Sequence, residues 1–184
     1  MEKEFAPTRL DVKALALAAG EISGQEPVSR YERLAQDLLG SGPDRMLHWS
    51  ARAEQRVGPD GKPAHWLHLA LKTALPMVCQ RCLGPVEVPI DIDRAFRFVA
   101  TEEAALAQDD EADEDLLVIS REFNLAELIE DELVMDVPLI PRHEVCPNPV
   151  KLEVADADFD AAATDKPNPF AALSGLVTAK GKKP

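Results

Sequence analysis

Four side chains of the types that bind soft metal ions form two short pairs in this sequence. Cys79 and Cys82 make a C-x-x-C, and His143 and Cys146 make an H-x-x-C much further along the chain. Thiolates and imidazole suit zinc, and four protein ligands would complete a structural site with no open position for a substrate. If the two pairs meet in the fold, the sequence predicts a structural zinc site.

The C-x-x-C pair is compatible with two other interpretations. Redox-active pairs usually lie at a helix N-terminus, where the helix dipole lowers the thiol pKa. Cys79 and Cys82 instead lie between two runs with strand periodicity and are followed by Leu83-Gly84-Pro85. A reduced pair that merely closes a hairpin is the simplest interpretation, and a thiol-dependent redox module is the other alternative to zinc.

Motifs of common enzyme classes are absent from the sequence. It contains no G-x-S-x-G, H-E-x-x-H, P-loop or G-x-G-x-x-G pattern. The run Glu130-Asp131-Glu132 could suggest acid–base or metal chemistry, but at helical spacing these side chains fan around a surface. We therefore predict a binding protein and not an enzyme.

The charge of the chain favours a basic partner. The formal net charge is −13 and the isoelectric point is about 4.7, which argues against the electrostatic footprint of a general nucleic-acid binder. A strongly basic protein would instead be attracted. Candidate contacts for it are Glu127, Glu130 and Asp131. Residues 101–115 carry many carboxylates and no basic residue, which predicts either a solvated mobile loop or a docking surface for a basic protein.

The elements that must position the cysteines are strands. Period-two alternation of apolar and polar residues predicts strands near 46–57, 66–77 and 86–98, with the C-x-x-C between the last two. Short turns between them predict an antiparallel β-meander, with Leu116–Ser120 as a fourth strand. Pro89 lies on the polar side of its run and predicts an edge position or a bulge.

Helices complete the predicted fold, which is of the α+β class. The sequence predicts a single domain over 1–146, with a helical N-terminal segment over 8–40, a sheet over 45–122 and an amphipathic helix over 124–137 that Asn124 caps. Residues 147–184 are rich in Pro, Ala and Asp and predict a largely unstructured tail, with a short docking segment near 168–176.

A direct RNA-binding surface is a second functional interpretation. If the meander forms, its outward face gathers cationic side chains, a histidine and an indole, which could contact phosphate and stack a base. The simpler interpretation is that another element covers the indole and the charges only solvate the surface. The candidate RNA-binding residues are Arg52, Arg56, Trp66, His68, Lys72 and Arg97.

The sequence predicts a cytoplasmic protein. No run approaches the ~20 apolar residues of a membrane span. The first residues lack the basic start and apolar run of a secretory signal. Three cysteines suit a reducing compartment better than a disulfide framework.

Three segments together resemble a known family. Cys79-Gln80-Arg81-Cys82 with Pro85 resembles the cysteine signature of the YceD family, the large ribosomal RNA subunit accumulation proteins. The runs Leu125–Leu133 and Pro138–His143 resemble its next conserved region, and Lys166–Leu173 resembles its C-terminal signature.

The resemblance implies a bacterial cytosolic factor, without known catalytic activity, that is needed for synthesis, processing or stability of 23S rRNA. Together with the acidity, it predicts action through a basic ribosomal protein or a large-subunit assembly intermediate, with 23S rRNA contacted directly or indirectly.

Overall fold

The computed structural model describes residues 6–36, 38–40, 45–148 and 154. Two compact units divide the chain after Pro147, and the fold described below is that of the first, Met1–Pro147. The predicted docking segment near 168–176 lies outside the described residues, so the division into a domain over 1–146 and a tail stays a prediction. Among the described residues, no helix has both the length and the apolar character needed to cross a membrane.

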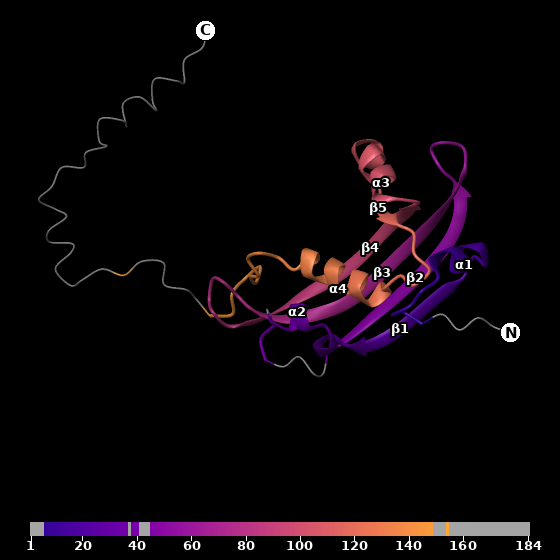
Figure 1. Ribbon diagram of the computed structural model, residues 1–184. Helices are drawn as coiled ribbons and strands as arrows, with labels where there is room; N and C mark the ends of the chain where they lie inside the picture. Colours follow the sequence, from indigo (N-terminus) through magenta and orange to yellow (C-terminus); the bar gives the residue numbers. More distant parts are fainter. Residues whose placement is uncertain (1–5, 37, 41–44, 149–153, 155–184) are drawn as a thin grey trace, which may run out of the picture. The chain divides into compact units, whose positions relative to one another are not determined.

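A five-stranded sheet in the order β1-β2-β3-β4-β5 forms the centre of the fold (Figure 1). Strands β1 to β4 pair antiparallel with their sequence neighbours, and β5 returns parallel to β4. The α+β class and the antiparallel meander are therefore confirmed, except that the strand predicted at Leu116–Ser120 forms as β5 and pairs parallel to β4. The strands are β1 Glu21–Pro27, β2 Met46–Val57, β3 Pro63–Val78, β4 Pro85–Val99 and β5 Asp115–Val118.

The core lies between one face of this sheet and three helices (Figure 1). Helix α1 (Val12–Leu17) contacts β2 and β3, helix α4 (Leu125–Asp136) contacts β4, and the short α2 (Glu32–Ala35) contacts α4. Alternate residues of β3, such as Leu69 and Leu71, are buried on this face. Each such side chain contributes about 1.5–3 kcal/mol through its burial.

Pro89 lies where β4 is an edge strand. On one side, Pro89 pairs with Ala74 of β3. On the other side it has no strand neighbour among the described residues, because β5 pairs only with Phe96–Val99 at the other end of β4. Proline offers no N–H for a further neighbour, so it is tolerated at this position. The predicted edge position is confirmed.

The N-terminal segment differs from the helical prediction. Between α1 and α2, residues Glu21–Pro27 form the edge strand β1, followed by a single 3-10 turn at Val28–Arg30. Gly24 and Pro27 are poor strand formers, and pairing with β2 overrides that preference. The indole of Trp49 packs on Gly24, where a Cβ atom would come within 2.6 Å of the ring.

Residues 101–115, here called the acidic arm, are also more structured than predicted. Thr101 caps helix α3 (Glu102–Gln108) by accepting the Ala104 N–H at 3.3 Å, and a 3-10 turn follows at Asp109–Glu111. The buried guanidinium of Arg97 donates to Gln108 Oε1 at 2.9 Å and to Glu114 Oε1. Arg97 of β4 thus holds the acidic arm at two points. The alternation of polar and apolar residues in the sequence does not predict these contacts.

Helix α4 matches its prediction closely. The side chain of Asn124 accepts the Glu127 N–H at 3.3 Å, and the apolar stripe Leu125, Leu128, Ile129 and Leu133 is buried. The same side of the helix carries the carboxyl group of Glu132, which is only 3% exposed. Arg94 Nε lies 3.0 Å from Glu132 Oε2. No hydrogen bond from the described residues reaches that oxygen.

Glutamine in place of Glu132 should remove a pH-dependent loss of stability. Burial raises the pKa of Glu132, Arg94 lowers it, and Asp115, Asp131 and Asp136 raise it further, with a net increase. The folded chain therefore binds more protons, and stability falls as pH rises from the unfolded-state pKa through the folded-state pKa. In urea unfolding between about pH 4 and 8, Glu132→Gln should flatten this slope.

The exposed Asp93 supplies the control for this experiment. Asp93→Asn should leave the pH slope of the wild-type chain in place. Near neutral pH, Glu132→Gln should be as stable as the wild type or more stable. If it instead loses more than about 1 kcal/mol at pH 7, the ion pair with Arg94 outweighs the cost of burying the charge.

Candidate metal centre

A tight turn between β3 and β4 places the C-x-x-C. The Cys79 N–H donates to the Gly84 carbonyl at 2.8 Å, and the Leu83 N–H donates to the Cys79 carbonyl at 2.8 Å. Leu83 has a φ of 57°, a left-handed conformation that costs a non-glycine residue roughly 1–2 kcal/mol. Such strain at a turn is a feature of functional sites, where surrounding interactions hold it in place.

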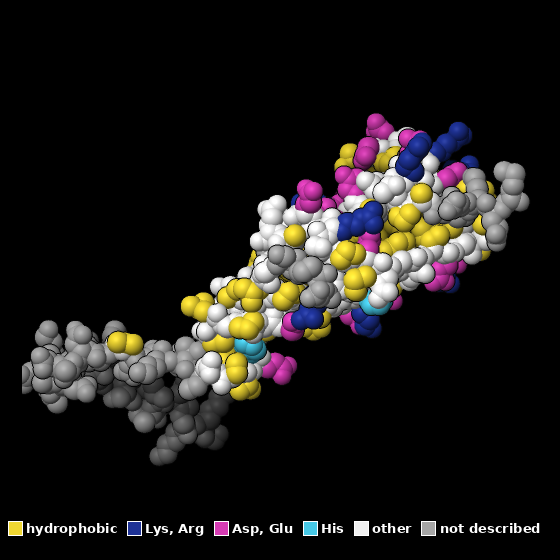
Figure 2. All heavy atoms as spheres, turned by 90° about the horizontal axis from the view of Figure 1, so that it is seen from below, with side chains coloured by type: hydrophobic (Ala, Val, Ile, Leu, Met, Phe, Trp, Pro, Cys, Tyr) yellow, Lys and Arg dark blue, Asp and Glu magenta, His cyan; other side chains and the backbone are white. Residues whose placement is uncertain are grey.

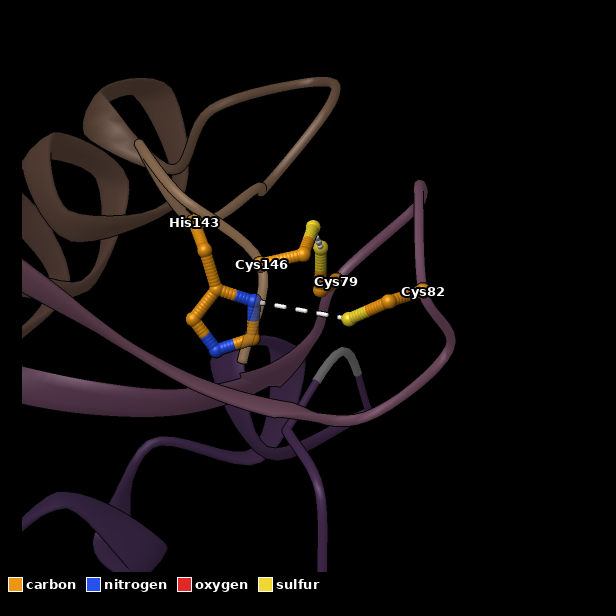
Figure 3. Close-up of side chains that lie close together, drawn as sticks. All are labelled: Cys79, Cys82, His143 and Cys146. Carbon is orange, nitrogen blue, oxygen red and sulfur yellow. Dashed lines mark hydrogen bonds between the residues drawn. The ribbon is translucent and has the colours of Figure 1, made fainter. Parts of the chain in front are cut away.

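The segment after α4 brings the second pair to this turn. Pro138 and Pro141 prevent helix from continuing, because proline lacks the N–H and clashes with the preceding turn. The Gln80 N–H donates to the Pro141 carbonyl at 2.8 Å and ties this segment to the turn. His143 and Cys146 consequently lie beside Cys79 and Cys82 (Figure 3). We call these four residues the Cys/His cluster.

The spacing of the cluster fits one four-coordinate metal ion. All four ligand atoms lie within 4.8 Å of one another. Sγ of Cys79 is 4.0 Å from Sγ of Cys146, and Sγ of Cys82 is 3.5 Å from Nδ1 of His143 (Figure 3). A tetrahedron with zinc–sulfur bonds of about 2.3 Å has edges of roughly 3.8 Å. The cluster could therefore hold a metal ion with little rearrangement.

A backbone carbonyl orients the imidazole of His143. Its Nε2 lies 3.0 Å from the carbonyl oxygen of Pro85. Because a carbonyl oxygen only accepts hydrogen bonds, Nε2 carries the proton and Nδ1 presents its lone pair toward Cys82. Metal-binding histidines are commonly held by a hydrogen bond of this kind from the nitrogen that does not bind the metal.

The thiols of the cluster differ in their tendency to ionise. Burial raises the pKa of Cys79, but hydrogen bonds from the backbone of Cys82, His143 and Arg81 and from the Cys82 side chain lower it to about 5. Burial raises the pKa of Cys146, and the neighbouring Cys82 and Cys79 raise it further. A divalent cation would favour thiolate at both positions. The donor set therefore suits a soft divalent metal.

The same geometry gives the redox interpretation less support. Redox pairs usually lie at a helix N-terminus and are partly exposed. Here the pair lies at a strand-to-strand turn, and Cys79 is fully buried. A lowered pKa alone does not give a buried thiol access to an oxidant or a partner thiol. The redox module stays an untested alternative.

Most of the candidate RNA-binding residues lie together on the sheet face opposite the core, but carboxylates engage them. Glu54 forms an ion pair with Arg56, lies 3.0 Å from Nε2 of His68 and 3.9 Å from the Arg52 guanidinium. Lys72 Nζ lies 2.9 Å from Asp91 Oδ2.

The other two RNA candidates are also engaged within the protein. The guanidinium carbon of Arg56 lies 5.5 Å from the ring centroid of Trp66, so it covers part of the indole. Arg97 is buried beneath the acidic arm and is not on the surface. On the face shown in Figure 2, basic side chains are scattered among acidic and apolar ones. Direct RNA binding by this surface stays a prediction.

Two of the three candidate partner contacts on α4 are held by one arginine. Glu130 accepts the Arg33 backbone N–H at 2.8 Å, and Asp131 lies 2.6 Å from the Arg33 guanidinium. Glu127 accepts from the Asn124 side chain at 3.3 Å. The acidic arm, in contrast, exposes many carboxylates without a cation partner among the described residues. These are Glu102, Glu103, Asp109, Asp110, Glu111 and Asp113.

Comparison with protein families identifies the relationship. The family model for the large ribosomal RNA subunit accumulation protein YceD matches residues 67–177, which is more than half of the 184 residues. The chain belongs to the YceD family. The resemblance inferred from its motifs is therefore confirmed. No solved structure matches the chain.

The family match covers both the Cys/His cluster and the acidic arm. The matched residues include β3 from Leu67 onward, β4, the acidic arm, α4 and all four members of the Cys/His cluster. The family description names a role in accumulation of the large ribosomal RNA subunit and names no reaction.

Proposed function

We propose that this YceD-family chain is a non-enzymatic, cytoplasmic ribosome biogenesis factor that supports accumulation of 23S rRNA by binding a basic ribosomal protein or a large-subunit assembly intermediate. The family match carries the first part of the proposal. The net charge of −13 supports the second part, and so do the exposed carboxylates of the acidic arm that have no cation partner among the described residues. An acidic surface attracts a basic protein and repels bare RNA.

The acidic arm is our proposed docking surface for that partner. Arg97 fixes it to β4, so its carboxylates are presented on an ordered support. Leu106 of α3 is 78% exposed among them. An apolar side chain surrounded by acidic groups suits a partner surface that carries lysine and arginine around an apolar contact.

Removing charge from the arm should release the chain from large-subunit precursors. In a sucrose gradient, the wild-type chain should sediment with 50S precursors, and less should do so as salt rises. The triple variant Asp109→Asn, Asp110→Asn, Glu111→Gln should remain mostly at the top of the gradient. These side chains are exposed and none forms an ion pair with a described residue, so the fold should be unaffected.

A matched variant removes the same charge elsewhere on the surface. Glu21→Gln, Asp93→Asn and Asp136→Asn change exposed residues and should leave sedimentation unchanged. Nuclease treatment then separates the two modes of binding, because association bridged by RNA would be lost and association with a protein would persist. Equal sedimentation of the two triple variants would contradict docking through the arm.

We also propose that the Cys/His cluster binds one structural zinc ion. The carrying observation is the pair of distances across the cluster, together with the Pro85 carbonyl that leaves His143 Nδ1 free to bind. Zinc would join the β3–β4 turn to the segment after α4. With four protein ligands it would leave no position for a substrate, which agrees with a binding role.

A further inference from the structure

A few cations of the first unit have no carboxylate partner among the described residues. Most described Lys and Arg side chains form ion pairs, as expected for a chain with a net charge of −13. The exceptions are Lys13, Arg81, Arg121 and Arg142. Lys13 and Arg121 are far apart in the sequence and line the same cavity. Two cations without a carboxylate partner in the described part of the chain, at one cavity, form a local positive site on an acidic protein.

The cavity lies between α1 and the segment that follows β5, and its volume is about 500 Å³. Pockets for small ligands and cofactors typically measure about 300–1,000 Å³. One wall consists of α1 residues Lys13, Ala14 and Leu17, and the other consists of Ile119, Ser120 and Arg121.

Backbone hydrogen bonds fix the two walls to each other. Leu10 and Phe123 exchange N–H to carbonyl bonds of 2.8 and 3.0 Å, and the Leu125 N–H donates to the Pro7 carbonyl at 2.8 Å. Ile119 N–H continues the pairing with β4 by donating to the Val99 carbonyl at 2.9 Å. The cavity is therefore formed before any ligand arrives, which lowers the entropic cost of binding.

The lining combines charge with apolar surface. Lysine binds phosphate as a point charge, and the arginine guanidinium presents several donors to its oxygens. Leu17 is 62% exposed and Ile119 is partly buried, so both offer apolar contact. Asp11 also lines the cavity. Its carboxylate accepts the Ala14 N–H at 2.9 Å as the cap of α1, which partly satisfies its negative charge.

We propose that this cavity binds a phosphate-bearing ligand, with phosphate at Lys13 and Arg121 and a sugar or base against Leu17 and Ile119. The phosphate could belong to a free nucleotide or to the backbone of single-stranded RNA. The residues that line this cavity include none of the acidic arm and none of the RNA candidates, so the proposal does not depend on docking by the arm.

Chemical shift changes in ¹⁵N-labelled full-length protein would test the site. A nucleoside diphosphate and a short single-stranded oligoribonucleotide should be titrated separately. At least one should shift the amide signals of Ala14, Leu17, Ser120 and Arg121. The double variant Lys13→Ala, Arg121→Ala should weaken that binding by at least about tenfold, because it removes both charge-assisted contacts to the phosphate.

A matched double variant, Arg45→Ala with Lys62→Ala, removes two exposed cations that already have carboxylate partners. It should bind both probes like the wild type, and so should the triple variant of the acidic arm. A response to RNA alone identifies a polymer ligand, and a response to the nucleotide identifies a free one. Wild-type affinity in the Lys13→Ala, Arg121→Ala variant would overturn the proposal. So would shifts of amide signals near every exposed cation, or the absence of shifts with either probe.

Discussion

Serine in place of Cys79 should abolish stoichiometric zinc binding and lower the free energy of unfolding by more than about 3 kcal/mol. For a domain of this size, that loss corresponds to roughly 6–12 °C in melting temperature. The reason is structural, since Cys79 is fully buried and the cluster is where the β3–β4 turn meets the segment after α4. Metal analysis of protein purified without a His tag, followed by thermal unfolding, measures both effects.

Two comparisons separate loss of metal from loss of packing. Arg81→Ser changes an exposed residue of the same turn that provides no metal ligand, and it should keep the zinc and nearly all of the stability. A strong chelator should destabilise the wild type by about as much as Cys79→Ser does and should have no effect on the Cys79→Ser protein. Absence of zinc from the wild type, with a melting temperature that chelator leaves unchanged, would contradict the proposal. Under the redox interpretation, stability would respond to reductant and not to chelator.

The strands of the sheet could be predicted because their signal is local. In β3 and β4, the alternation of buried and exposed side chains is encoded residue by residue, and Gly84-Pro85 marks the turn between the strands. β1 could not be predicted in this way. Glu21–Pro27 becomes a strand because β2 supplies hydrogen-bonding partners and Trp49 packs on Gly24, and neither contact has a signature in the segment itself.

The Cys/His cluster shows where sequence reasoning about a site ends. The residue types of Cys79, Cys82, His143 and Cys146 indicated zinc chemistry, but only the fold brings the two pairs together. The two pairs meet because of the direction in which the chain leaves α4 and because the Gln80 N–H donates a hydrogen bond to the Pro141 carbonyl. The tautomer of His143 depends on the Pro85 carbonyl, which no spacing rule contains.

The sheet face that carries the RNA-binding candidates is the opposite case, because the sequence already indicated part of its ion pairing. Glu54 lies on the same face as Arg52 and Arg56 by simple alternation, and Asp91 lies opposite Lys72 in the register of β3 and β4. Pairing of these charges could have been anticipated. The burial of Arg97 could not, because it results from the acidic arm folding over β4.

Methionine in place of Arg97 should destabilise the protein by about 3–5 kcal/mol, as expected when one partner of a buried ion pair is removed. The Arg97 side chain is 5% exposed and that of Glu114 is 15% exposed. The substitution would leave the Glu114 carboxylate and the Gln108 amide without the donor that now satisfies both. Urea unfolding would measure the loss, and faster hydrogen exchange at the α3 amides would localise it to the acidic arm.

Arg45→Met provides the matched control for Arg97→Met. Its ion pair with Glu87 is about half exposed on both sides, so it should cost no more than about 1 kcal/mol. The two variants also separate the charge of the arm from its organisation. Each removes one positive charge, so long-range attraction to a basic partner should be similar or slightly stronger in both. If docking requires the arm to be held on β4, however, Arg97→Met alone should sediment poorly with 50S precursors under conditions in which the protein remains folded. Equal sedimentation of the two variants would mean that the carboxylates act by charge alone, without the support that Arg97 provides.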